Sequence, residues 1–71
     1  MKVADAITSN MTLVHYETDA LLKRIPSHVD ADDLRAAGFE ALTASAHSFD
    51  PTLGVPFDRY AARRIRGALL D

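Results

Sequence analysis

The strongest constraint on the fold is a helical repeat of apolar residues that is interrupted at two proline-containing segments. Pro26 disfavours helical backbone at Ile25, so a helix is expected to end near Arg24. The second interruption, residues 50–54 with the sequence DPTLG, has the composition of a tight turn. No segment alternates polar and apolar residues as a half-buried strand would. The chain is therefore expected to be all-α.

Three helices are predicted around these interruptions, over residues 10–24, 31–48 and 56–70, with an additional turn at residues 3–7. Each helix carries apolar or small residues at steps of three and four, which places them on one face. The three stripes are Met11, Val14, Thr18, Leu21 and Ile25; Leu34, Gly38, Ala41, Leu42, Ser45 and Phe49; and Phe57, Ala61, Ile65, Ala68 and Leu69. With 71 residues, the prediction is one domain over residues 1–71, a small bundle of three to four helices.

Short-range signals mark where these helices begin and how closely they pack. Asp30 is the expected N-cap of the second helix, with Asp33 as a capping-box acid, and Pro56 suits the start of the third. Gly38, Ala41 and Ala44 are small, so a neighbouring helix is expected to approach the second helix closely.

Composition excludes several classes of function. The absence of cysteine excludes a disulfide framework and a thiolate nucleophile, and it favours an intracellular, cytoplasmic setting. No apolar run approaches the roughly 20 residues that span a bilayer, so no membrane partner is predicted. His15, His28 and His47 fall on three segments without ligand spacing, so neither a metal site nor a cofactor is expected. The adjacent Asp32 and Asp33 suit a helix start better than acid–base catalysis, and nothing argues for an enzyme.

Charge is distributed unevenly along the chain. The formal charge is −4 over residues 1–50 and +2 over residues 51–71, within a net charge of −2. A domain with one acidic part and one arginine-rich end is suited to two different partners, although ordinary surface charge would look the same.

The last helix carries most of the arginine. Arg59, Arg63 and Arg66 recur at helical spacing on a face away from the apolar stripe, and Tyr60 and Arg64 lie on an adjoining face. Guanidinium groups pair with phosphates, and an exposed aromatic ring can stack on an unpaired base, so these five residues are candidates for DNA binding. The alternative is a solvated helix face with a tyrosine in the core.

A longer pattern extends over residues 11–71. A Pro-Ser-x-Val connector is followed by DDL--AG, then FDP--G--F--YA, and finally RIRGA-LD. This pattern resembles bacterial RNA polymerase sigma factors of the sigma-70 family, and in particular their flagellar and sporulation type. The matching positions are Pro26, Ser27, Val29, Asp32, Asp33, Leu34, Ala37, Gly38, Leu42, Ala44, Phe49, Asp50, Pro51, Gly54, Phe57, Tyr60, Ala61, Arg64–Ala68, Leu70 and Asp71.

The resemblance implies conserved region 2, an all-helical module that binds core RNA polymerase and the promoter −10 element. In the family, the helix that opens with DDL--AG docks on a coiled coil of the polymerase β′ subunit. Carried over, the polymerase-binding candidates are Asp33, Leu34, Ala36, Ala37, Phe39 and Thr43. The next helix faces the melted non-template strand, so Tyr60 is expected near a flipped −10 base and the arginines along the strand backbone.

The chain departs from the family pattern at three points. Ala36 stands where many members have glutamine, and Arg63 and Arg64 stand where housekeeping members have tryptophan. The family also continues beyond the position of Asp71. The expected function is a region 2 fragment of a sigma factor, which contributes to −10 recognition and melting. The alternatives are a short sigma-like module that binds polymerase or an anti-sigma factor without initiating transcription, and a bundle that self-associates through exposed Leu69 and Leu70.

Overall fold

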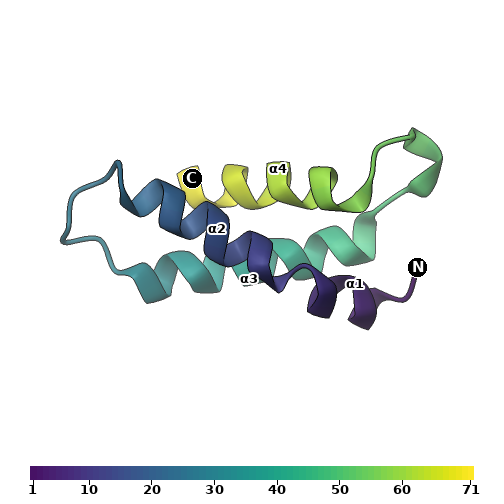
Figure 1. The fold of residues 1–71 in the computed structure, drawn as a ribbon, viewed down its shortest axis with the longest axis horizontal. Helices are drawn as coiled ribbons and strands as arrows, with labels where there is room; N and C mark the ends of the chain where they lie inside the picture. Colours follow the sequence, from purple (N-terminus) through teal and green to yellow (C-terminus); the bar gives the residue numbers. More distant parts are fainter.

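The computed structural model describes all 71 residues and confirms an all-α fold. Its elements are α1 (Val3–Ser9), α2 (Met11–Leu22), α3 (Ala31–Ser48), the 3₁₀-helix η1 (Pro51–Leu53) and α4 (Phe57–Leu70). Figure 1 shows α3 and α4 lying antiparallel along the long axis, with α2 crossing beside both of them and α1 next to α3. The molecule measures 40 × 20 × 17 Å. None of its helices combines the length and apolar character needed to cross a membrane.

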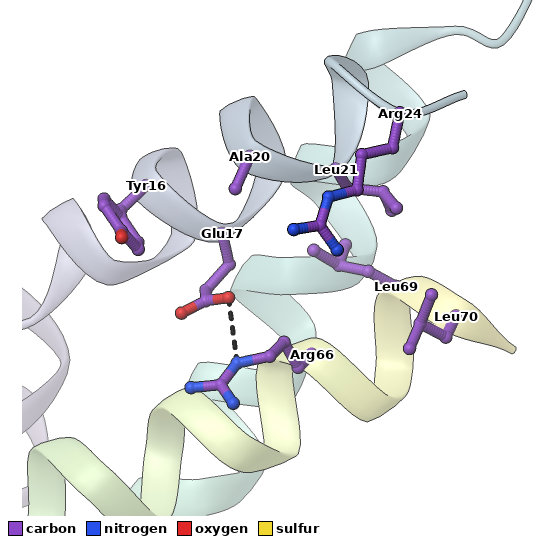
Figure 2. Close-up of a pocket in the computed structure, with 8 residues that line it drawn as sticks. All are labelled: Tyr16, Glu17, Ala20, Leu21, Arg24, Arg66, Leu69 and Leu70. Atoms are coloured by element: carbon purple, nitrogen blue, oxygen red, sulfur yellow. Dashed lines mark hydrogen bonds and ion pairs between the residues drawn. The ribbon is translucent and has the colours of Figure 1, made fainter. Parts of the chain in front are cut away.

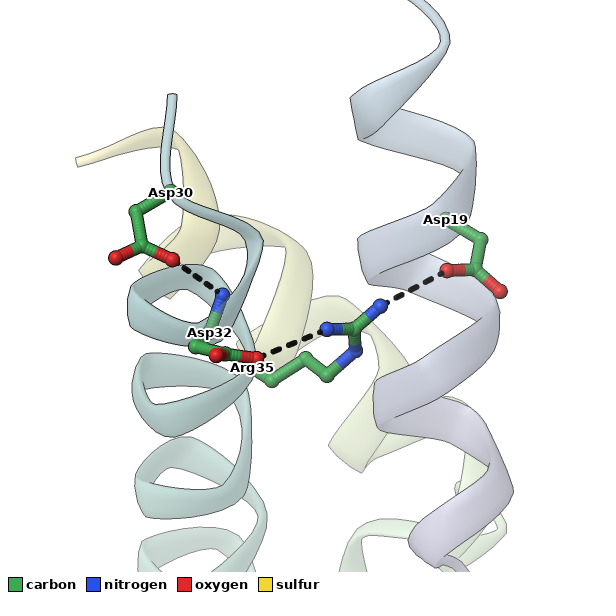
Figure 3. Close-up of polar contacts among 4 residues, drawn as sticks. All are labelled: Asp19, Asp30, Asp32 and Arg35. Carbon is green, nitrogen blue, oxygen red and sulfur yellow. Dashed lines mark hydrogen bonds and ion pairs between the residues drawn. The ribbon is translucent and has the colours of Figure 1, made fainter. Parts of the chain in front are cut away.

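Two aspartates begin the elements that follow the interruptions. The Asp30 carboxylate accepts a hydrogen bond from the backbone N–H of Asp32 at 2.9 Å, so the predicted N-cap of α3 is confirmed (Figure 3). Asp33 makes no reciprocal bond, and the expected capping box is wrong, because an aspartate is one carbon shorter than the glutamate that normally reaches back. Asp50 caps η1 in the same way through Thr52, and Gly54 closes the turn with a φ of 75°, which suits glycine.

The first half of the chain differs from the prediction mainly at its start. Residues 3–7 are part of a complete helix, α1, and not an isolated turn. The side-chain amide of Asn10 donates to the carbonyl of Ala6 at 2.8 Å, which satisfies one of the unpaired carbonyls where α1 ends. At the other end, α2 ends at Leu22, two residues before Arg24 and so close to the predicted end, and the N–H of Arg24 bonds to the carbonyl of Leu21 in a tighter turn.

The core lies where α2, α3 and α4 meet. It consists of Val14, Leu42, Ala61, Ile65 and Leu69. The close approach predicted at Gly38 is confirmed, because a Cβ atom added there would lie 2.8 Å from Cγ1 of Val14. The core therefore depends on the absence of a side chain at this one position of α3.

Two expectations about exposure are corrected by the packing, at Leu69 and at Met11. Leu69 is only 7% exposed, so the prediction that it lies open for self-association is wrong, whereas its neighbour Leu70 is 72% exposed. Leu69 follows Ile65 by one turn on the buried stripe, which explains the difference. Met11 was assigned to the stripe of α2 but is 42% exposed.

An arginine links α2 to the start of α3. The guanidinium of Arg35 lies 3.3 Å from the Asp32 carboxylate on its own helix and 3.8 Å from Asp19 on α2 (Figure 3). Because the two carboxylates are exposed and Arg35 is partly exposed, such pairs contribute up to about 1 kcal/mol each. Their main effect is to fix how the side chains are arranged between the two helices.

Candidate nucleic-acid and protein interfaces

The outer face of α4 carries two unpaired arginines. Arg59 and Arg63 are exposed, and their guanidinium groups make no ion pair or hydrogen bond within the protein. They are one helical turn apart on the side opposite Ile65, which is fully buried. This face can therefore offer two free positive charges to an anionic partner.

Arg66 is held by the neighbouring helix. Its Nε donates to Oε1 of Glu17 on α2 at 3.0 Å, as Figure 2 shows. The Glu17 side chain is 9% exposed and that of Arg66 is 60% exposed, so the carboxylate is buried and the guanidinium is partly in solvent. The three arginines share one face, as expected, because Arg59, Arg63 and Arg66 line the same surface hollow. Arg66 lies at the edge of that face, toward α2, and is the one of the three that is paired.

Glu17 was missed by the sequence analysis. A buried carboxylate is rare unless it is paired. The available signal was its spacing, three residues after Val14 and four before Leu21, which places it beside the apolar stripe of α2. Its partner, 49 residues away, could not be found from spacing.

Tyr60 and Arg64 lie at the other edge of α4, against the end of α3. Nη1 of Arg64 lies 2.9 Å from the Tyr60 hydroxyl and 2.7 Å from Oγ of Ser48, the last residue of α3. Hydrogen bonds from Ser48 and Arg64 lower the pKa of the Tyr60 phenol from its ordinary value, because they stabilise the phenolate. The ring is half-buried and packs on Phe49, with centroids 5.4 Å apart. Tyr60 is thus neither a free ring nor a core residue.

The six polymerase-binding candidates on α3 fall into two groups. Asp33, Ala36 and Thr43 are exposed on the outer side of the helix. The other three candidates are partly buried and pack against the core: Leu34, Ala37 and Phe39. Phe39 also meets the His15 ring of α2 edge-on, with centroids 5.5 Å apart. The first group is available to a partner, while the second mainly positions α3.

A shallow cleft separates α2 from the C-terminal end of α4. Its volume is about 310 Å³, and Leu21 and Leu69 are among its lining residues, with Arg24, Arg66 and Tyr16 also around it (Figure 2). The Glu17–Arg66 pair lies within this cleft. The cleft contains no serine, histidine or aspartate, so its lining does not provide a hydrolytic triad.

Comparison with known proteins decides the family. Residues 7–71 match the profile of the family Sigma-70 region 2. The chain belongs to this sigma-70 family. The family is not an enzyme family.

Similar curated proteins are sigma factors of one type. The RNA polymerase sigma-D factor of Bacillus subtilis is 37% identical over 67 residues, which cover 94% of this chain and 26% of that protein. The RNA polymerase sigma factor FliA of Escherichia coli K12 is 42% identical over 59 residues, covering 83% and 25%. FliA of Pseudomonas aeruginosa is 45% identical over 51 residues, covering 72% and 21%. The chain thus spans about a quarter of the length of these relatives. No solved structure matches it significantly.

The sigma-70 assignment confirms the resemblance drawn from the motifs, and the structure explains part of one motif. In the string from Arg64 to Ala68, Arg64 contacts α3, Ile65 lies in the core and Arg66 contacts α2. Three consecutive residues of this sigma-70 domain therefore attach α4 to α3, to the core and to α2.

Proposed function

We propose that this chain is a sigma factor region 2 domain that binds core RNA polymerase and contributes to recognition and melting of the promoter −10 element. The observation that carries the proposal is the family match over residues 7–71, together with relatives of the FliA type. Such a domain works where core polymerase works, so we place it in the cytoplasm. It acts by binding and needs no cofactor.

The protein-facing surface in this proposal is the outer side of α3. Asp33, Ala36 and Thr43 are exposed there, with Asp32 and Glu40 adding further negative charge. An acidic helix face with small residues suits a basic helical partner, because small side chains allow close approach and the charges steer encounter. We assign the β′ coiled coil as this partner.

The DNA-facing surface in this proposal is α4. Arg59 and Arg63 are free to neutralise phosphates of the non-template −10 strand, and the Tyr60–Arg64 edge lies beside them for contact with an unpaired base. Binding a single strand in preference to the duplex shifts the equilibrium toward open DNA without covalent chemistry. Arg66 contributes less to this surface because Glu17 already shares its charge.

Capture of core polymerase tests the protein-facing half of the proposal. Asp33→Ala is expected to weaken binding of the immobilised chain to core polymerase about tenfold, because a charge at the proposed interface is removed. The matched control is Asp5→Ala, which removes an exposed aspartate from α1 and should bind as the unchanged chain does. Equal capture of all three proteins would exclude the assigned interface.

The alternative of a sigma-like module that binds polymerase or an anti-sigma factor without touching DNA makes a different prediction. Such a module would bind polymerase normally and show no affinity for single-stranded −10 DNA at low salt. An anti-sigma partner and self-association both stay predictions, and a mass measurement at increasing concentration tests the second.

A further inference from the structure

The last residue of α3 joins the two proposed surfaces. Oγ of Ser48 lies 2.7 Å from Nη1 of Arg64 and 2.9 Å from the Tyr60 hydroxyl oxygen. The same Arg64 nitrogen lies 2.9 Å from that hydroxyl oxygen, so the three polar atoms form a closed triangle. Ser48 is 16 residues from Arg64 in sequence, so this contact is made between helices and not within one.

Both N–H groups on Nη1 of Arg64 are engaged in the triangle, and one hydroxyl hydrogen remains free. Nη1 of Arg64 has two N–H groups, one for each oxygen, and one of the two hydroxyl groups donates to the other. Three N–H groups of the guanidinium remain, on Nε and Nη2, and these form the edge that pairs bidentately with a phosphate. Ser48 therefore holds Arg64 by one nitrogen and leaves its anion-binding edge unused.

The Tyr60 ring is held at two points. At one, Phe49 packs against it with centroids 5.4 Å apart and planes at 49°, and Phe49 is itself supported edge-on by Phe57 at 5.3 Å. At the other, Ser48 and Arg64 bind the hydroxyl group. With both the ring and its polar end fixed, the side chain has little freedom to rotate.

We propose that Ser48 is a positioning residue, which fixes the Tyr60 ring and the Arg64 guanidinium in the orientation that α4 presents to a single DNA strand. This inference rests on the proposed DNA-facing role of α4. It assigns a function to a residue at the end of the polymerase-facing helix that makes no proposed contact with polymerase or DNA.

Solvent exposure separates this role from a purely structural one. Ser48 and Arg64 are exposed, so water replaces their hydrogen bonds when one is removed, and the fold loses little stability. The orientation of the side chains is lost all the same. A binding reaction then has to order Tyr60 and Arg64 at the moment of contact, which weakens affinity.

Binding of a single-stranded 12-nucleotide oligonucleotide carrying a −10 sequence, measured by fluorescence anisotropy at low salt, tests the inference. Ser48→Ala is expected to weaken binding about fivefold, the equivalent of one hydrogen bond, while the melting temperature stays nearly unchanged. Ser48→Thr keeps the hydroxyl and should restore the affinity. The control is Thr8→Ala, which removes a hydroxyl that bonds only to the Ala4 carbonyl within α1.

A second variant and a spectroscopic readout show whether Ser48 acts through its two partners. In an Arg64→Met, Tyr60→Phe background, Ser48→Ala should cause no further loss of affinity. With Tyr16 replaced by phenylalanine, the phenol absorbance reports Tyr60 alone, and Ser48→Ala should raise its pKa toward the ordinary value of 10.0. A serine with only a structural role would not both lose its effect on affinity in that background and change the pKa of Tyr60.

The outcomes distinguish the inference from the proposal beneath it. If Arg63→Gln weakens DNA binding but Ser48→Ala does not, the role of Ser48 is overturned and the DNA-facing role of α4 stands. If the unchanged chain has no affinity for the oligonucleotide, the DNA-facing role falls and the role of Ser48 falls with it.

Discussion

At the scale of residues, the four arginines of α4 have three different environments. Arg59 and Arg63 are unpaired, Arg64 is bound by Ser48 and Tyr60, and Arg66 is bound by Glu17. Helical spacing groups Arg66 with Arg59 and Arg63 on one face, and it does not show that Arg66 alone of the three is paired. Replacing Arg66 should therefore lower the stability of the fold, whereas replacing Arg63 should weaken the proposed DNA binding.

Arg66→Met tests the stabilising role of the Glu17 pair. We expect the free energy of unfolding to fall by roughly 1–3 kcal/mol, because a buried carboxylate loses its partner while the aliphatic stem is retained. The control Arg59→Met removes an unpaired, exposed guanidinium and should stay within about 0.5 kcal/mol of the unchanged chain. Urea unfolding measures both. Equal stability of the two variants would mean that Glu17 does not need Arg66.

At the scale of elements, two glycines in helices give a matched pair. Gly38→Ala would place a Cβ atom 2.8 Å from the fully buried Val14, and overpacking of this kind costs roughly 1–3 kcal/mol against a gain of about 1 kcal/mol in helix propensity. We expect a net loss of stability. Gly67→Ala meets nothing within 4 Å and should stabilise α4 by about 0.5–1 kcal/mol. If urea unfolding shows the same gain for both, Gly38 does not set the spacing of α2 and α3.

The helices could be predicted from the sequence because their signals are local. The Asp30 cap is confirmed, and α3 has the predicted bounds, since a cap and a 3.6-residue period act within a few residues. The contacts of Arg66 with Glu17 and of Ser48 with Arg64 could not be predicted. They depend on how the helices are rotated about their axes, which no single helix determines.

The candidate sites were predictable only in part, for a related reason. The family resemblance gave six positions on α3 without distinguishing those that face outward. Leu34, Ala37 and Phe39 pack against the core, so their contribution to a partner is limited by what they already contact. Similarly, the motif gave Tyr60 and Arg64 but not Ser48, which lies outside the matched positions and is joined to them only by the fold.

At the scale of the whole molecule, charge is segregated between two helices. The free arginines lie on α4, and exposed acids lie on the outer side of α3. The two proposed partners differ in charge to match: DNA is a polyanion, and the partner proposed for α3 is a basic helical surface. If the proposed function holds, this arrangement would let the domain bind both partners at once with little competition between them.

The salt dependence of DNA binding tests this segregation. Each phosphate contact to a single strand contributes about 0.7 to the slope of log affinity against log salt, so Arg63→Gln should lower the slope by about that amount. Lys23→Gln removes one exposed positive charge at the end of α2, on another helix than Arg59 and Arg63, and should leave the slope unchanged. Anisotropy titrations at several salt concentrations measure it. A similar decrease for both variants would indicate that only net charge matters.

The position of α3 between both proposed surfaces limits how such a domain can change over generations. The buried side of α3, with Gly38, Leu42 and Ser45, sets the location of α4 and also that of α3 itself. A substitution there displaces two binding surfaces together, and a single later change cannot correct both. Adaptation to a new promoter or to a changed polymerase should therefore proceed through outward positions such as Arg63 and Asp33, while the buried side of α3 drifts most slowly.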